Sequence, residues 1–364
     1  MVGDPGDPGK PGGTDSPADA ASGPGIAVIG TGAWGTTLAR LAAEQADRRG
    51  GGDVVLWEHQ ADRAAELERA RENAAFLPGF RFPSRLHVTA DLADAVAGRA
   101  IVLLVTPAQR VRENVRALAP RLAPGAVVVC ASKGLELGTH RRMTQIVAEE
   151  LGQDAPVAAL SGPNLAREVA HGLPAAAVVA ARRPEVSERV RAALTTPRFR
   201  VYTGDDVVGV ELGGALKNII ALVAGISDGL RYGDNAKASI MTRGLAEIAR
   251  LAVAAGAHPL TLAGLAGLGD LVATCSSPLS RNRTLGLELA SGRSLAELLA
   301  ERRTVAEGVT TARAALELAA DLGVDLPITT QLVEVLFAGK DVQQAVVDLM
   351  ERDPKRELEG LRGG

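Results

Sequence analysis

Two segments that lie far apart in the chain carry residues suited to chemistry. The first, Gly30-Thr31-Gly32-Ala33-Trp34-Gly35, has the glycine spacing of a loop that holds a dinucleotide. Gly30 would permit a tight turn, Gly32 would let the backbone approach a pyrophosphate, and Gly35 would let a strand and a helix pack closely. A plain glycine-rich turn has the same composition, so the elements around the loop must decide.

The second segment places one lysine in an apolar run. Lys217 lies within Leu212–Gly225, among Leu216, Ile219 and Ile220. A lysine in such surroundings either extends its ammonium group to water or serves acid–base chemistry. Burial would lower its pKa toward the range useful for proton transfer. On this segment alone, both interpretations stand.

Three further segments carry polar residues between apolar runs. Lys133 could bind an anion or be solvated in a loop. The turn with Gly162 and Asn164 could offer N–H groups to a ligand or be a simple tight turn. The segment 267–283 combines a carboxylate with hydroxyl, guanidinium and amide groups, which suits a small phosphorylated ligand. A capped helix start with surface arginines would have the same composition.

The elements around the glycine loop predict a βαβ unit. Apolar strand-like runs at 26–29 and 54–57 flank a helix-like stretch at 34–44. Further strand-like runs, several separated by helix-like stretches, lie at 100–105, 126–131, 157–160, 175–180 and 200–202. This alternation predicts an α/β fold with a Rossmann-type, doubly wound parallel sheet. The glycine loop then has the context that dinucleotide binding requires.

The pattern changes after about residue 205. From Val207 to Met350 the chain is rich in Ala and Leu at helical spacing, which predicts a second, all-helical domain. Glycine, proline and aspartate dominate the start of the chain, where the Gly-x-Pro run is too short for a collagen helix. We expect a disordered tail over 1–24, a dinucleotide-binding domain over 25–205, a helical substrate and catalytic domain over 206–352, and a loose tail over 353–364.

Composition narrows the class of protein. The chain has 364 residues and a net charge of -3, which gives no electrostatic case for binding nucleic acid. Cys130 and Cys275 are the two cysteines, and with scattered histidines they indicate neither a disulfide framework nor a metal site. No uncharged apolar stretch of about 18 residues predicts a membrane span. We expect a cytoplasmic protein.

The end of the second strand bears on the choice of nucleotide. An acidic residue such as Glu58 at this point normally accepts a hydrogen bond from the ribose 2′-hydroxyl and favours NAD. His59 and Arg63 could instead meet the 2′-phosphate of NADP. A solvated turn explains these residues equally well, so NADP and NAD both remain open.

Taken together, these segments resemble bacterial NAD(P)-dependent glycerol-3-phosphate dehydrogenase. The resemblance runs from about Ile26 to Met350. Its motifs are the glycine loop, Asn73-Ala74-Ala75-Phe76-Leu77-Pro78, Ser132-Lys133-Gly134, Ser161-Gly162-Pro163, Leu212-Gly213-Gly214-Ala215-Leu216-Lys217-Asn218, Gly267-Leu268-Gly269-Asp270 and Ser280-Arg281-Asn282-Arg283. It implies interconversion of dihydroxyacetone phosphate and sn-glycerol 3-phosphate by hydride transfer with NAD(P)H, which would supply glycerol 3-phosphate for phospholipid synthesis. It leaves open whether the chain forms a homodimer.

The resemblance also assigns residues, with Lys217 as the catalytic acid–base group. The positions that match substrate contacts are Lys133, Gly162, Asn164, Lys217, Asp270, Ser280, Arg281 and Asn282. Beside the glycines Gly30, Gly32 and Gly35, the positions that match cofactor contacts are Ala33, Trp34, His59, Lys133, Ala166, Arg281, Val305 and Glu307. Asn164 stands where Thr or Ser is commoner, and Glu58 where a small residue is frequent.

Two other functions fit parts of this pattern. A dehydrogenase of the same two-domain build could act on a hydroxy acid or a sugar acid, and it would have a carboxylate site in place of a phosphate site. A non-catalytic dinucleotide sensor would bind NAD(P) without turnover. The polar cluster of Lys217, Asp270 and Arg281 exceeds what a sensor needs.

Overall fold

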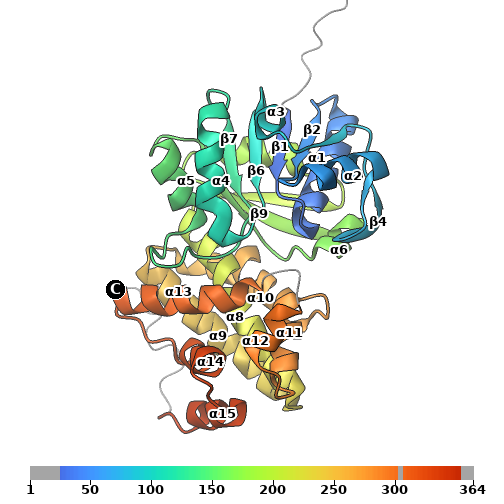
Figure 1. Ribbon diagram of the computed structural model, residues 1–364. Coiled ribbons are helices and arrows are strands. Elements are labelled where there is room, and N and C mark those ends of the chain that lie inside the picture. Colours follow the sequence, from blue (N-terminus) through green and yellow to red (C-terminus); the bar gives the residue numbers. More distant parts are fainter. Residues whose placement is uncertain (1–24, 302–305, 354–364) are drawn as a thin grey trace, which may run out of the picture.

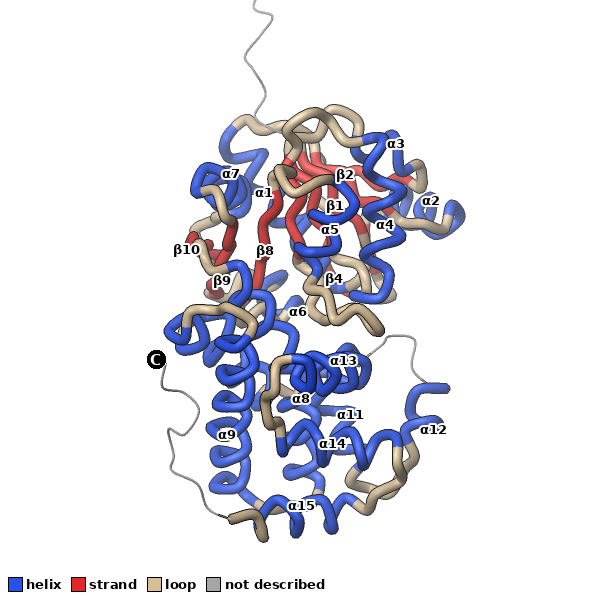
Figure 2. The backbone as a smooth tube through the Cα atoms, turned by 90° about the vertical axis from the view of Figure 1, so that its left-hand side faces the viewer, coloured by secondary structure: helices blue, strands red, loops and turns tan. Residues whose placement is uncertain are grey.

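Two halves of different secondary structure make up the chain. The computed structural model describes residues 25–301 and 306–353, and within them every strand lies before residue 205 and only helices follow. Figures 1 and 2 show the strands gathered in one half of the molecule and the later helices in the other. The tail expected over 1–24, nearly all of the tail expected from 353, and Val305 lie outside the described residues.

The first half is built on one eight-stranded sheet. Its strand order is β10-β9-β8-β7-β6-β1-β2-β5, with β1 Ile26–Ile29, β2 Val54–Trp57, β5 Leu86–Thr89, β6 Ile101–Leu104, β7 Val127–Cys130, β8 Val157–Ser161, β9 Ala175–Ala181 and β10 Phe199–Gly204. The predicted doubly wound fold is confirmed. Its neighbouring strands are parallel except β8 and β9, which pair antiparallel. Apolar runs show which strands are buried, but they do not encode the direction of pairing.

The sequence does not predict three of the strands. β3 Glu72–Asn73 and β4 Leu77–Arg81 form a separate hairpin, and β5 forms one edge of the main sheet. β3 and β4 are short and hold Pro78, Gly79 and charged residues in place of an apolar run. Such strands depend on tertiary contacts, which local patterns do not contain.

The strand order reverses between β1 and β6. Ile26 of β1 is paired with Val54 of β2 on one side and with Ile101 of β6 on the other. In open α/β sheets, ligands bind outside the carboxyl ends of the strands at such a point. The loops that follow Ile29 and Leu104 therefore border the expected nucleotide site.

Helices cover both faces of the sheet. α1 Ala33–Arg49, α2 Ala61–Ala70 and α7 Pro184–Leu194 pack on one face, and α3 Leu92–Val96, α4 Val111–Leu118 and α5 Met143–Leu151 pack on the other. Successive side chains of a strand point to opposite faces, so Val28 joins the first layer and Ile29 the second. Short helical segments at Ala108–Arg110, Ala119–Arg121 and α6 Ala166–Ala170 complete the connections.

The second half is organised around one long helix. The helices of this half are α8 Val207–Gly229, α9 Gly233–Ala254, α10 Asp270–Ser276, α11 Arg281–Leu289, α12 Leu295–Ala300, α13 Glu307–Asp321, α14 Pro327–Phe337 and α15 Val342–Met350. α8 packs against α9, α10, α11, α13 and α14. A tight turn at Pro259–Ala263 and a π-helical segment at Leu265–Gly269 lead into α10. α8 begins where the Asp206 side chain accepts a hydrogen bond from Gly209 N at 2.8 Å.

α8 is also unusually apolar. Among the described residues it is the one helix long and apolar enough to cross a membrane, and 78% of its most apolar stretch is buried inside the molecule. A core helix of a folded domain can have the same length and apolar composition. Leu135, from the loop after β7, is fully buried in the helical core beside residues such as Leu216, so the two halves share that core.

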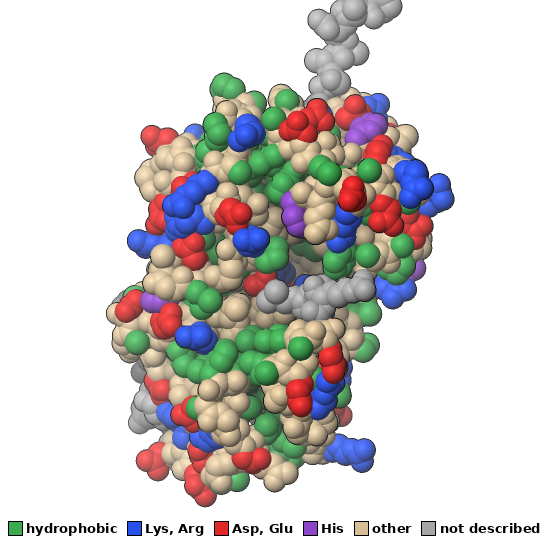
Figure 3. Space-filling model, viewed as in Figure 1, with side chains coloured by type: hydrophobic (Ala, Val, Ile, Leu, Met, Phe, Trp, Pro, Cys, Tyr) green, Lys and Arg blue, Asp and Glu red, His purple; other side chains and the backbone are tan. Residues whose placement is uncertain are grey.

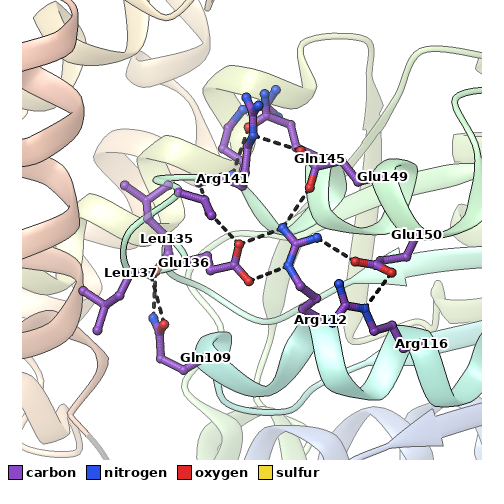
Figure 4. A network of polar contacts seen from close by, with 12 residues as sticks. Gln109, Arg112, Arg116, Leu135, Glu136, Leu137, Arg141, Gln145, Glu149 and Glu150 are labelled. Carbon is purple, nitrogen blue, oxygen red and sulfur yellow. Dashed lines mark hydrogen bonds and ion pairs between the residues drawn. The ribbon is translucent and has the colours of Figure 1, made fainter.

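A network of ion pairs holds the loop after β7 against α4 and α5 (Figure 4). Arg112 of α4 donates to both oxygens of Glu136 at 2.8 and 2.7 Å. It also donates to Glu149 at 2.8 Å and to Glu150 at 2.7 Å. Because Glu136 lies three residues after Lys133, this network fixes the loop that carries that lysine.

Charged side chains are mixed on the face seen in Figure 3. Acidic and basic groups lie interspersed over the sheet-containing half, and hydrophobic side chains gather on part of the helical half. No extended patch of one sign is visible on this face.

Candidate active site

The glycine loop has the geometry of a phosphate cradle. Gly30 has φ +117°, and a Cβ there would lie 2.8 Å from Val105 O. A Cβ on Gly35 would lie 2.0 Å from Gly30 O, so the loop packs closely against its own helix. A Cβ on Gly32 would meet nothing within 4 Å, which leaves the backbone there open to an incoming group. These surroundings fit the three roles expected from the spacing.

The start of α1 offers donors without protein partners. Gly32 precedes the helix and provides no side-chain cap, so the first N–H groups, from Ala33 onward, are free for an anion. Trp34 packs edge-on against Phe199, and its Nε1 is buried with no hydrogen-bond partner among residues 25–301 and 306–353. These features fit the pyrophosphate and neighbouring groups of a dinucleotide.

Lys217 and Asp270 meet at the junction of the two halves. The Lys217 ammonium donates to Asp270 Oδ1, and to Thr274 Oγ1 at 2.6 Å. Lys133 Nζ donates to the other oxygen of Asp270 at 2.6 Å and to Gly162 O at 3.1 Å. Asp270 is only 1% exposed, so one buried carboxylate bridges two lysines.

The surroundings of Lys217 shift its acidity. Burial in the apolar body of α8 is the main cause, and it lowers the pKa of Lys217 from 10.5 to about 8. The Asp270 carboxylate opposes this shift, whereas the positive charge of Lys133 reinforces it. A lysine with this pKa can donate or accept a proton near neutral pH. The sequence-based expectation of a lowered pKa is therefore supported, with both causes visible.

A second group of polar residues lies on α11, beside the same helix. Asn282 Nδ2 donates to Asn218 Oδ1 at 2.9 Å, and Asn218 directly follows Lys217. Asn282 Oδ1 accepts from Gly308 N at 3.1 Å. Arg281 is exposed, and no described residue forms a hydrogen bond or ion pair with its guanidinium group. Ser280 Oγ accepts from Arg283 N at 3.3 Å and so caps α11.

The loop after β8 contributes a glycine in the left-handed region and the side-chain amide of Asn164. Gly162 has φ +141°, and a Cβ there would lie 2.9 Å from Ala177 Cα, so only glycine fits where Lys133 reaches the backbone. Asn164 Oδ1 and Nδ2 are both buried, and neither atom has a hydrogen-bond partner in the part of the chain that the structure describes, which leaves an acceptor and a donor for a ligand. Ala166, expected on the cofactor side, begins α6, and its carbonyl accepts from Thr37 of α1 at 3.2 Å.

Glu307 joins the helical half to the nucleotide half. It begins α13, and its Oε1 accepts from Ala108 N, after β6, at 3.2 Å. Burial raises the pKa of Glu307. Its expected contact with the cofactor stays a prediction, as does that of Val305, which lies outside the described residues.

Residues at the end of β2 are arranged differently from the expectation. Glu58 is buried and bonds Thr31 of the glycine loop, while His59 is largely exposed. The Glu58 carboxylate therefore faces the protein, and neither of its oxygens is open to a ribose hydroxyl.

Two neighbours of the site lie in segments that the sequence singled out, but the sequence assigned them no contact. Thr274 accepts from Lys217 and donates to Asp270 O at 2.6 Å, one helical turn along α10. Asn218 holds Asn282. The signal was present, because Asp270 and Thr274 are four residues apart in the sequence and thus share one face of a helix. Within the described residues, no group of three His, Cys, Asp or Glu side chains could hold a metal ion.

Known proteins match this chain over about nine-tenths of its length. The family model for the N-terminus of NAD-dependent glycerol-3-phosphate dehydrogenase matches residues 25–187, and the model for the C-terminus matches residues 206–347. The "Glycerol-3-phosphate dehydrogenase [NAD(P)+]" of Geobacter metallireducens is 51% identical over 337 residues, which cover 91% of this chain and 98% of that protein.

Solved structures agree with the sequence comparison. The glycerol-3-phosphate dehydrogenase of Coxiella burnetii is 39% identical with a TM-score of 0.86, covering 91% of this chain and 99% of that one. The enzyme of that name from Saccharomyces cerevisiae is 27% identical with a TM-score of 0.78, covering 91% of this chain and 100% of that one.

Proposed function

This chain belongs to the family of NAD(P)-dependent glycerol-3-phosphate dehydrogenases, and on that premise we propose that it interconverts dihydroxyacetone phosphate and sn-glycerol 3-phosphate. The observation that carries the proposal is the buried pair of Lys217 and Asp270. Asn218 and Asn282 join this pair to α11, where Arg281 forms no ion pair with a described residue. A proton donor and a phosphate anchor are thus held on adjacent helices.

Lys217 is the acid–base group of the reaction. The bound nicotinamide supplies or accepts the hydride. In reduction, the Lys217 ammonium gives its proton to the oxygen that was the carbonyl oxygen of the substrate, and this oxygen becomes the hydroxyl group. In oxidation, the neutral amine takes that proton back. The lowered pKa supports this role, because both protonation states are accessible near neutral pH.

Asp270 and Thr274 hold the lysine in place. Asp270 stabilises the ammonium form, and Thr274 fixes the direction of the Nζ group. Lys133 shares the carboxylate, and its charge keeps the ammonium acidic. The site thereby combines orientation with a proton that leaves easily.

Arg281 and Asn282 are the proposed phosphate contacts. The guanidinium group can donate two parallel hydrogen bonds to phosphate oxygens. Burial of Asn282 and its bond to Asn218 fix the start of α11 relative to Lys217. The buried amide of Asn164, whose polar atoms bond no described residue, supports a further contact with the substrate.

An assay of the purified protein tests the proposal. Oxidation of NADPH and of NADH should be followed at 340 nm with dihydroxyacetone phosphate, and with a 2-keto acid that lacks phosphate as the control. We expect turnover with the phosphate ester and little with the keto acid. The reverse result would favour a hydroxy-acid dehydrogenase, and nucleotide binding without turnover on either would favour a sensor.

The cellular role is proposed on the same basis. The product, glycerol 3-phosphate, would supply phospholipid synthesis in the cytoplasm. Depletion of the chain in its host should create a growth requirement for glycerol 3-phosphate, and fractionation should find the protein away from the membranes.

A further inference from the structure

Glu58, at the end of β2, is enclosed by protein donors. Its Oε2 accepts from Thr31 Oγ1 and lies 3.2 Å from Arg63 Nε. Its Oε1 accepts from Gln60 N at 3.2 Å and lies 2.8 Å from His59 Nδ1. Glu58 is only 2% exposed. An acidic residue that accepts a hydrogen bond from a ribose hydroxyl must face the ligand, whereas Glu58 faces the protein.

The β3–β4 hairpin braces the same cluster. Asn73 Nδ2 donates to Thr31 O at 2.7 Å and to Thr36 Oγ1 at 2.8 Å. The Phe76 ring lies 4.6 Å from the guanidinium carbon of Arg63. Thr31 of the glycine loop and Arg63 of α2 are therefore parts of one fixed unit, which lies where the adenosine ribose of a dinucleotide binds.

Hydrogen-bond donors of Arg63 and of the start of α2 have no partner among the described residues. Arg63 uses Nε on Glu58, and neither of its terminal nitrogens has a partner among the described residues. Its Nη2 is buried, while the side chain is 26% exposed. The ten-residue helix α2 has no side-chain cap, because Gln60 makes no capping bond, so its first N–H groups are also available. Asp62 in the same turn is exposed and acidic, and His59 is the other nearby titratable group.

We propose that Arg63 recognises the 2′-phosphate of NADPH, and that Glu58 anchors Arg63 instead of binding the ribose hydroxyl. The proposal rests on the dinucleotide site of the proposed function. The guanidinium group of Arg63 keeps N–H donors that no described residue accepts, and these suit phosphate oxygens. The uncapped start of α2 adds favourable donors. Glu58 and the Phe76 ring hold the guanidinium in that position. An acidic residue at the end of β2 thus coexists with acceptance of NADPH.

Binding of two nucleotide fragments tests this proposal without any turnover. Adenosine 2′,5′-bisphosphate and adenosine 5′-monophosphate differ only in the 2′-phosphate, and calorimetry of the full chain gives both dissociation constants. We expect the bisphosphate to bind at least about tenfold more tightly, as a charge-assisted contact provides. Arg63→Ala should reduce that ratio to about twofold or less, with the affinity for the monophosphate nearly unchanged. Arg69→Ala, an exposed arginine in the last turn of the same helix, is the matched control and should keep the ratio.

A second variant guards against a folding defect. Arg63→Ala leaves Glu58 buried without its cation, so Glu58→Gln with Arg63→Ala removes both charges together. This double variant should show the same loss of preference. The proposal is overturned if the wild-type chain does not prefer the bisphosphate. It is also overturned if Arg63→Ala and the double variant both keep the preference, or if both fragments bind these variants equally more weakly than they bind the wild type. Neither fragment is a substrate, so the absence of a preference for the bisphosphate would not contradict the proposed reaction. Likewise, an absence of turnover with dihydroxyacetone phosphate would not change the outcome of the binding experiment.

Discussion

Two clusters of charged side chains use similar groups with opposite results. Near the surface, three arginines and three glutamates form the network Arg112, Arg116, Arg141, Glu136, Glu149 and Glu150. In the interior, Lys217 and Lys133 share the one carboxylate of Asp270. The first cluster is balanced in charge and partly exposed. The second has one excess positive charge, and its Lys217 and Asp270 are buried.

The acidities of the two clusters shift in opposite directions. Hydrogen bonding to Glu136 is the largest cause that raises the pKa of Arg112, and bonding to Arg112 is the largest cause that lowers the pKa of Glu136. Each charge there stabilises the other. Burial is the largest cause that lowers the pKa of Lys217. The positive charge of Lys133 adds to this shift, and the Asp270 carboxylate opposes it. An ion-pair network thus indicates chemistry only where it is buried and short of counter-charge.

The largest expected effect comes from removing the shifted lysine. Lys217→Ala should lower kcat for dihydroxyacetone phosphate by roughly 10²–10⁴-fold, the usual contribution of a general acid. Binding of NADPH, measured by fluorescence titration, should be nearly unchanged, because Lys133 still pairs with Asp270. Lys217→Arg should also fail, since arginine does not release its proton. Lys340→Ala, which removes a paired lysine on the surface of the helical half, is the control. A loss below about tenfold would remove Lys217 from this role.

Arg281 provides a third case, an exposed cation whose guanidinium group forms no hydrogen bond or ion pair with a described residue, although the Glu307 carboxylate acts on it from a distance. Arg281→Ala should raise KM for dihydroxyacetone phosphate by about tenfold or more, because a charge-assisted contact contributes about 1.5–3 kcal/mol. Steady-state kinetics at saturating NADPH measures this value. If KM for the nucleotide rises and KM for the substrate does not, Arg281 belongs to the cofactor instead.

The pH profile tests whether charge imbalance sets the acidity of Lys217. Reduction needs the ammonium form, so kcat/KM for dihydroxyacetone phosphate should fall as the pH rises through about 8. Lys133→Met removes a neighbouring positive charge that lowers the pKa of Lys217. The alkaline limb should therefore move to higher pH in this variant. A limb that stays in place would show that the charge of Lys133 does not contribute to the shift, and a limb that moves to lower pH would contradict the proposed role of that charge.

The sequence located those functional residues that a short segment of the chain is enough to identify. The glycine loop follows one strand and begins one helix, and Lys217 interrupts one apolar run, so short segments contain the evidence for both. Contacts between distant segments could not be found this way. Arg112 and Glu150 are 38 residues apart, and nothing in either segment points to the other.

Glu58 shows the same limit at a single residue. The rule for acidic residues after the second strand predicts a contact with ribose, yet Thr31 and Arg63 enclose the carboxylate. Arg63 lies five residues later on α2, and its stacking on Phe76 depends on the β3–β4 hairpin. That hairpin carries no strand-like apolar run, so the direction in which Glu58 points could not be derived from the sequence.

The smallest expected effect concerns the balanced cluster, where loss of a charge should alter stability and not turnover. Arg112 is 20% exposed, and Arg112→Ala leaves three glutamates close together, so we expect a loss of about 1–3 kcal/mol after allowance for solvent screening. The Tm should fall by several degrees in calorimetry while kcat stays near the wild-type value. Because the pKa of Glu136 is lowered in the folded chain, the ionised carboxylate stabilises the fold above its ordinary pKa of 4.5, and this contribution is lost as the pH falls. The difference in Tm should therefore narrow in acid.

Arg116→Ala, at a side chain that is 65% exposed with one bond to Glu150, should change Tm much less. If Arg112→Ala instead lowers kcat as Lys217→Ala does, the two clusters are coupled through the loop that carries Lys133 and Glu136, and the division between them fails.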